Sequence, residues 1–272
     1  MTFSSQKEIH ILHVDDEPDF ADMTATFLER EDDRFTVETA ISADEGLEKI
    51  NDYAPDCVVS DYNMPGTGGI VFLKSVHKDF PDLPFILFTG KGSEEVASDA
   101  ISAGVTDYLQ KESGTEQYAV LTNRITNAVA QTRAEHQLEQ ERQRSQVLFE
   151  RLTQPTVEVE YEDNKPIVQQ INPAFEDVFG YNASEIVGNS LDDYVIPEGK
   201  VKEASQINQH VQAGGKLNSV EATRQTTDGN REFLLQNAVY KDGSGGFAIY
   251  TDITDRKQRE ESLNALQGVT RD

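Results

Sequence analysis

The chain has 272 residues, of which 37% are hydrophobic, and this length allows two domains that each bury a core. No apolar run approaches the roughly 20 residues that a membrane helix needs, the first ten residues lack the apolar core of a signal peptide, and the single cysteine excludes intramolecular disulfides and cysteine-rich zinc sites. A formal charge of −25 and an isoelectric point near 4.4 argue against direct nucleic-acid binding, because no basic excess is available to meet phosphates.

The same composition predicts the surroundings of the protein. We expect a cytoplasmic protein that makes no membrane contact. A charge this large works against compaction unless salt screens it, so we expect a halophilic protein. An acidic domain that meets basic partners is an alternative that the sequence leaves open.

Up to about residue 110, five short apolar runs alternate with helix-like segments. These runs cover residues 9–14, 35–40, 57–60, 85–88 and 105–109. Continuous apolar character is typical of strands that helices cover on both faces, and the alternation predicts a parallel, doubly wound α/β sheet. Cys57, inside the third run, is expected to be a small buried residue without a redox role.

Four of these predicted strands end in polar residues that suit one site. Asp15 and Asp16 follow the first run, Asp61 follows the third, Thr89 closes the fourth and Lys111 comes just after the fifth. Ligands of doubly wound sheets bind at the carboxyl ends of the strands. We therefore expect these side chains to converge on one site.

In order, spacing and chemistry, these residues resemble the receiver domain of two-component response regulators, over about the first 120 residues. The resemblance implies a flavodoxin-like fold in which Asp61 accepts a phosphoryl group from a sensor histidine kinase. It also implies that Mg²⁺ is bound by Asp15, Asp16, Asp61 and the backbone carbonyl of Asn63. Lys111 would pair first with Asp61 and then with the phosphoryl group.

The resemblance further implies a conformational switch. Thr89 matches the switch hydroxyl and Tyr108 the switch aromatic, although an aromatic residue at a strand end can equally be a core residue. Two positions depart from the family pattern, because Gly90 follows the switch threonine and Glu112 follows the lysine in place of the usual proline. The first departure predicts a more mobile switch loop.

The acids at 15–17 also have a plainer explanation. Pro18 suits the first position of a helix, and acidic residues stabilise helix N-termini. This explanation does not account for Asp61 and Lys111 together, so the phosphorylation site is preferred. A degenerate receiver that serves only as a scaffold is disfavoured by the complete set of acids, threonine and lysine.

Residues 116–152 contain no proline or glycine and predict one long helix that joins two domains. Leu138, Leu148 and Leu152 lie near heptad positions, but Glu141 and Ser145 interrupt the seam. A dimer-forming signalling helix and a solvated spacer both remain open. His136 on this segment lacks the flanking residues of a kinase phosphorylation box, and an ordinary solvated histidine is favoured.

After residue 155 the pattern changes to an α+β order with an antiparallel sheet. The predicted strands cover residues 157–161, 166–171, 217–227, 231–240 and 246–253, and the predicted helices cover 173–180, 183–187 and 198–213. Together with the motifs at 171–175, 179–181, 185–188 and 252–256, this order resembles a PAS sensory domain. A further helix is expected from 256 to 266, opened by Thr254 and Asp255.

The ligand of this PAS-like part is not predicted, and it can be none. A flavin photoadduct is excluded because the only cysteine, Cys57, lies in the other domain. His210 lies where a haem ligand occurs in some PAS proteins, but a single histidine on a helix is mostly structural.

These observations predict a receiver at 1–122, a helical connector at 123–152, a PAS domain at 153–256 and a C-terminal helix at 257–272 that leads to another module in similar haloarchaeal proteins. We expect a non-enzymatic phosphorelay protein that receives its phosphoryl group from a histidine kinase and forms a homodimer through the connector and PAS domain. The alternative is the front part of a hybrid sensor kinase, or of a DNA-binding regulator whose output module lies outside this sequence.

Overall fold

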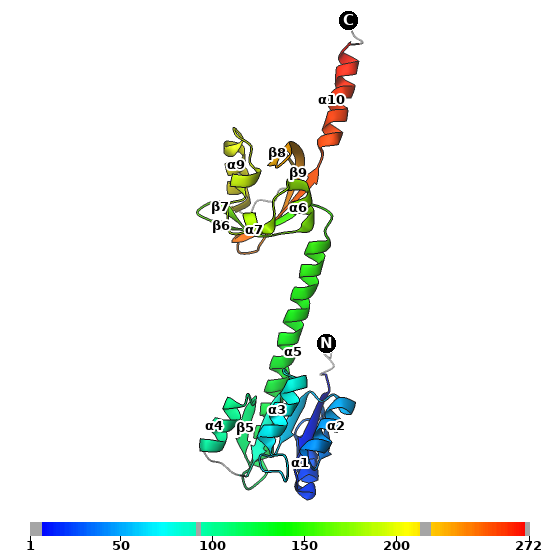
Figure 1. The fold of residues 1–272 in the computed structure, drawn as a ribbon, viewed down its shortest axis with the longest axis vertical. Coiled ribbons are helices and arrows are strands. Elements are labelled where there is room, and N and C mark those ends of the chain that lie inside the picture. Colours follow the sequence, from blue (N-terminus) through cyan, green and yellow to red (C-terminus); the bar gives the residue numbers. More distant parts are fainter. Residues whose placement is uncertain (1–6, 91–93, 213–218, 270–272) are drawn as a thin grey trace. The chain divides into compact units, whose positions relative to one another are not determined.

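The first five strands of the chain form one parallel sheet (Figure 1). The computed structural model describes residues 7–90, 94–212 and 219–269, and it divides into two units, Met1–Gln140 and Glu141–Asp272. The strands of the first unit have the spatial order β2-β1-β3-β4-β5, and every neighbouring pair is parallel. Their bounds are β1 (Ile9–Val14), β2 (Phe35–Ala40), β3 (Cys57–Ser60), β4 (Phe85–Thr89) and β5 (Asp107–Gln110).

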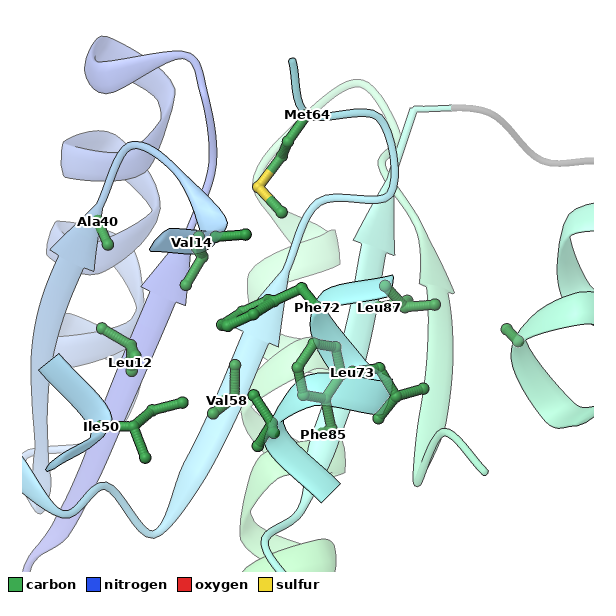
Figure 2. Close-up of a cluster of buried hydrophobic side chains, with 13 residues drawn as sticks. Leu12, Val14, Ala40, Ile50, Val58, Met64, Phe72, Leu73, Phe85 and Leu87 are labelled. Carbon is green, nitrogen blue, oxygen red and sulfur yellow. The ribbon is translucent and has the colours of Figure 1, made fainter. Parts of the chain in front are cut away.

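Helices cover both faces of this sheet. They are α1 (Pro18–Glu31), α2 (Ala43–Tyr53), α3 (Gly69–Asp79), α4 (Glu94–Ser102) and the long α5 (Glu116–Arg151). On one face, Ile11 and Val59 pack with residues of α1 and α5. On the other face, Phe72 and Leu73 of α3 lie over the strands (Figure 2). The doubly wound architecture is confirmed, and Cys57 is buried in β3 as expected.

The fifth strand begins two residues later than predicted. Gly104 takes a positive φ of 87°, and the Val105 amide donates to the Ala100 carbonyl, so the chain is still closing α4 at this point. Val105 packs against the hydrophobic core from this turn. The predicted strand therefore began too early, because the apolar Val105 precedes the residues that pair in the sheet.

The long helix was predicted correctly and begins at Glu116. Its first turns belong to the core of the first unit through four buried residues, Tyr118, Leu121, Ile125 and Val129. Further along, Arg133 donates to the Glu8 carbonyl at 2.7 Å and pairs with the Asp56 carboxylate at 2.8 Å. The first unit therefore holds α5 well beyond residue 122.

The second unit contains an antiparallel sheet in the order β7-β6-β10-β9-β8. Its strands are β6 (Thr156–Glu162), β7 (Lys165–Ile171), β8 (Val220–Thr226), β9 (Gly229–Val239) and β10 (Gly245–Asp252). Its helices are α6 (Pro173–Phe179), α7 (Ala183–Ile186), α8 (Asp192–Val195), α9 (Val201–Gln212) and α10 (Thr254–Val269). The short α8 was not predicted, whereas the α+β order is confirmed.

Some predicted limits fall outside the described part of the chain. The third strand of the second unit was expected from residue 217 and the preceding helix to 213, and residues 213–218 are not described. Within the described residues, stacked aromatic rings lie at the centre of the hydrophobic core of the second unit. Phe179 stacks on Phe175 and Phe233 at centroid distances of 4.3 and 4.9 Å, and Tyr250 meets Phe179 edge-on at 5.1 Å.

Candidate functional site

The carboxyl ends of β1, β3 and β5 bring three of the predicted residues into direct contact. Asp15 follows β1, Asp61 follows β3 and Lys111 follows β5. The Lys111 ammonium nitrogen lies 2.7 Å from Asp15 Oδ2 and 2.7 Å from Asp61 Oδ1. One lysine therefore bridges two carboxylates that are 46 residues apart in the sequence.

Backbone amides hold the other oxygen of each carboxylate. The Glu17 amide donates to Asp15 Oδ1 at 3.0 Å, and the Asn63 amide donates to Asp61 Oδ2 at 2.6 Å. These contacts close short turns directly after the strands, so each side chain is oriented by its own loop. The Asp61 amide in turn donates to the Val14 carbonyl at 2.8 Å, which ties the two loops together.

The site is negatively charged and largely shielded from water. Asp15 is 1% exposed and Asp61 7% exposed, and Asp16 beside them is partly exposed. Burial lowers the pKa of the Lys111 ammonium, but the hydrogen bonds that it donates to Asp15 and Asp61 outweigh this effect, so the pKa lies above its ordinary value. One cation thus contacts two carboxylates, with Asp16 next to Asp15 in the sequence, and the excess negative charge favours a further cation.

Close backbone packing fixes the loop that carries Asp61. Gly69, the first residue of α3, lies so near this loop that an added Cβ would collide with the Asp61 carbonyl oxygen. The Gly69 amide donates to the Tyr62 carbonyl at 2.9 Å. The start of α3 therefore sets the position of the loop that carries Asp61.

Family models match both parts of the chain. A response regulator receiver domain matches residues 11–123, and a PAS fold matches residues 143–249. The chain is a receiver domain followed by a PAS domain. These domains and the relatives below belong to two-component signalling, and neither domain is a catalytic core.

Curated relatives resemble the chain at low identity. A nitrogen assimilation regulatory protein, NtrX, from Azorhizobium caulinodans is 28% identical over 65% of this chain and 36% of its own length. The sensor histidine kinase TmoS from Ectopseudomonas mendocina is 23% identical over 94% of this chain and 30% of its own length. The chain therefore spans about a third of these relatives. A CheY-like receiver domain protein from Methanospirillum hungatei, of known structure, is 29% identical over 47% of this chain and 99% of its own, with a TM-score of 0.43.

The predicted switch residues lie at the neighbouring strand ends of the receiver. Thr89 closes β4 and is fully buried, and its carbonyl accepts the Lys111 amide at 2.8 Å. Tyr108 on β5 is partly buried against the core, and burial raises its pKa. The backbone thus connects Thr89 directly to Lys111, whereas the switch role of Tyr108 stays a prediction.

The predicted metal ligands are present without a ready-made metal cluster. Across residues 7–90, 94–212 and 219–269, no group of three or more His, Cys, Asp or Glu side chains is arranged to hold a metal. The donor chemistry nevertheless fits Mg²⁺, because the carboxylates of Asp15, Asp16 and Asp61 supply oxygen donors. Among the described residues, Asp15 Oδ1 and Asp61 Oδ2 each accept one backbone hydrogen bond, which leaves a second lone pair on each oxygen.

Two residues near the site were not predicted. Phe20 places its ring 4.3 Å from the Lys111 nitrogen, which shields the ammonium by a cation–π contact. His13 is fully buried with its Nε2 4.0 Å from Asp15 Oδ2. Burial, with a smaller effect of the Lys111 charge, lowers the pKa of His13 to about 4. A polar residue inside an apolar strand was the only sequence signal for His13.

His136 and His210 lie outside the receiver site and outside the cavity of the PAS domain. His136 is exposed on α5 with its ring 3.6 Å from Asp82. His210 lies on the exposed face of α9 and does not line the cavity of the PAS domain. Of the helices that the structure describes, none combines the length and the apolar character that crossing a bilayer requires.

Proposed function

We propose that Asp61 accepts a phosphoryl group from a sensor histidine kinase and that the receiver passes this signal to the PAS domain. The contact of Lys111 with both Asp15 and Asp61, at 2.7 Å each, is the observation that carries the proposal. Burying a lysine between two carboxylates costs desolvation free energy. Such an arrangement is typical of a site that binds or transfers a charged group.

In the transfer, an oxygen of the Asp61 carboxylate attacks the phosphorus of a phosphohistidine. The P–O bond of an acyl phosphate forms, the P–N bond breaks, and the leaving imidazole takes up a proton. Lys111 meets the charge that moves onto the phosphoryl oxygens, and the Asn63 amide keeps Asp61 oriented. A bound Mg²⁺, held by Asp15, Asp16, Asp61 and the Asn63 carbonyl, would neutralise the remaining charge.

The signal leaves the site through Thr89. Its hydroxyl is proposed to donate to the new phosphoryl group, and Gly90 next to it allows the loop to move. Because the Lys111 amide donates a hydrogen bond to the Thr89 carbonyl, a shift of the end of β4 would also move the end of β5. Tyr108 is proposed to turn inward in the phosphorylated population.

The output requires a partner. We propose a homodimer that forms through the connector and the PAS domain, with no enzymatic activity and no nucleic-acid or membrane contact. Three leucines of the connector, Leu138, Leu148 and Leu152, are 69%, 69% and 43% exposed and offer apolar surface for a second copy. We also propose the division into receiver, connector, PAS domain and C-terminal helix at residues 122, 152 and 256.

Phosphorylation by a small-molecule phosphodonor tests the proposal. Intact mass is measured with and without Mg²⁺ in molar salt, which also matches the proposed halophilic character. The wild type should gain one phosphoryl group only with Mg²⁺, and Asp61→Asn should gain none. Asp79→Asn, an exposed carboxylate at the end of α3, should behave as the wild type. No gain in the wild type would refute the phosphoacceptor assignment.

A hybrid sensor kinase is the second candidate, because the match to the sensor histidine kinase spans 94% of this chain. Incubation of the chain with ATP separates the two. We expect no autophosphorylation, and a phosphohistidine formed from ATP would favour the kinase.

A further inference from the structure

The PAS domain contains a cavity between its sheet and the helices α8 and α9. Residues of β6, β8, β9 and β10 form one wall, and residues from 191 to 211 form the other. The cavity has a volume of about 50 Å³. With about 10 to 15 Å³ per water in this measure, the free space suits a ligand of only a few non-hydrogen atoms.

Arg224 of β8 lines this cavity and is 3% exposed. Its Nη1 donates to the neighbouring Thr223 carbonyl at 2.9 Å, and its guanidinium also hydrogen-bonds the Tyr250 side chain. Its buried Nε has no hydrogen-bond partner among the described residues. Among the described residues, no carboxylate oxygen lies within 4.0 Å of the Arg224 guanidinium, so Arg224 forms no ion pair there. A buried guanidinium with unused donors is costly, so the site favours an anion that is not part of the fold.

Asp192, at the start of α8, carries a charge opposite to that of Arg224. Asp192 lines the same cavity and accepts a hydrogen bond from Asn208 at 2.8 Å. Burial raises the pKa of Asp192, and the Asn208 hydrogen bond and the Arg224 charge oppose that rise. Asp192 and Arg224 therefore line the same cavity with opposite charges.

The remaining lining decides the kind of anion. Val159, Leu235 and Ala248 give the sheet side an aliphatic wall. An aliphatic wall and a planar guanidinium suit a short organic acid, because a carboxylate takes two parallel hydrogen bonds from an arginine. A strongly hydrated inorganic anion would lose its water against this wall without replacement.

We propose that the PAS cavity binds a short aliphatic carboxylate, whose oxygens accept hydrogen bonds from Nε and Nη of Arg224. Simple organic acids and small α-amino acids share this group. An amino acid would also place its ammonium against Asp192 and Asn208 on the helix side of the cavity. The PAS domain would then sense a small metabolite independently of the phosphorylation of Asp61.

The proposal is tested by titrating the full-length protein, in molar sodium chloride, with three groups of small molecules. Acetate, propionate and pyruvate form one arm, glycine and alanine a second, and acetamide and inorganic phosphate a third. Binding is followed by calorimetry and by the NMR signal of arginine Nε–H groups. We expect at least one carboxylate to bind and to shift one buried Nε–H signal, and we expect acetamide and phosphate to do neither.

Variants assign the contact and the source of the carboxylate. Arg224→Gln should weaken binding at least about 100-fold, and Arg231→Gln, an arginine of β9 paired with Asp228 and Asp252, should leave it unchanged. If Asp192→Asn weakens the amino acids and not the simple acids, the ligand is zwitterionic.

Three outcomes would overturn the proposal. They are no binding of any carboxylate, equal binding of acetamide and acetate, and binding of phosphate alone. Arg224 would then have a role in the fold of the PAS domain and not in ligand binding. If Arg224→Gln fails to fold, the comparison of acetate with acetamide on the wild type still decides.

Discussion

Replacing Asn172 with alanine tests how the PAS domain holds the end of the connector. Asn172 is fully buried at the start of α6. Its Oδ1 accepts the amides of Thr156 at 2.8 Å and Phe175 at 3.0 Å. Its Nδ2 donates to the carbonyls of Leu152 at 3.1 Å and Gln154 at 3.0 Å. One side chain therefore joins the residue after α5, the first residue of β6 and the first turn of α6.

The expected cost follows from which groups lose their only partner. The Phe175 amide still donates to the Asn172 carbonyl, and the Gln154 carbonyl still accepts the Thr156 hydroxyl. The Leu152 carbonyl belongs to an exposed residue and can reach water. This leaves the Thr156 amide, at about 1–3 kcal/mol for a buried unpaired group, and the lost helix cap, at about 1 kcal/mol. We expect Asn172→Ala to lower the free energy of unfolding of the PAS domain by about 2–4 kcal/mol.

Urea unfolding followed by circular dichroism measures this loss, because the chain has no tryptophan for fluorescence. Hydrogen exchange at Thr156 should accelerate in the same variant. Asn189→Ala, an exposed asparagine with one hydrogen bond to the Glu185 carbonyl, should change stability by less than about 0.5 kcal/mol. A loss below about 1 kcal/mol for Asn172→Ala would refute the argument that this side chain anchors the connector.

Three further predictions concern packing, anchoring and pH. Gly69→Ala should destabilise the receiver by about 1–3 kcal/mol and slow phosphorylation of Asp61, because the added Cβ would collide with the Asp61 carbonyl. Gly90→Ala, whose Cβ would meet nothing within 4 Å, should not destabilise the receiver. Equal urea midpoints for the two variants would contradict the prediction. Arg133→Ala should speed hydrogen exchange in the first half of α5 by removing the contacts with Glu8 and Asp56, whereas Arg142→Ala on the exposed part should not; unchanged exchange would show that the core contacts alone hold the helix. Burial raises the pKa of Tyr161 to about 12, so the folded protein holds this proton more tightly; its contribution to stability is complete below pH 10 and is lost between pH 10 and 12. Tyr161→Phe should flatten that part of the stability curve, and a parallel curve would refute the buried phenol.

The receiver site was predictable because fold and site share one rule. Continuous apolar runs predicted a parallel sheet, and parallel strands place their carboxyl ends at one edge, so Asp15, Asp61 and Lys111 had to meet. No comparable rule marks Arg224. In an antiparallel strand, an arginine beside Thr223 and Gln225 suggests a solvated position. Its burial depends on α8 and α9, and the four-residue α8 is too short to leave a periodic pattern.

The partly buried Lys111 and the buried Arg224 differ in a way that bears on function. Lys111 is balanced within its own fold by two carboxylates at 2.7 Å, so the proposed phosphorylation of Asp61 would have to redistribute existing contacts. Arg224 meets no carboxylate within 4.0 Å among the described residues and keeps an unused donor, so the PAS domain gains most when an anion enters. The receiver is therefore expected to respond by exchange of partners, and the PAS domain by ligand-dependent stabilisation. A ligand that binds only the native PAS domain raises its stability with concentration, which phosphorylation of Asp61 alone does not do.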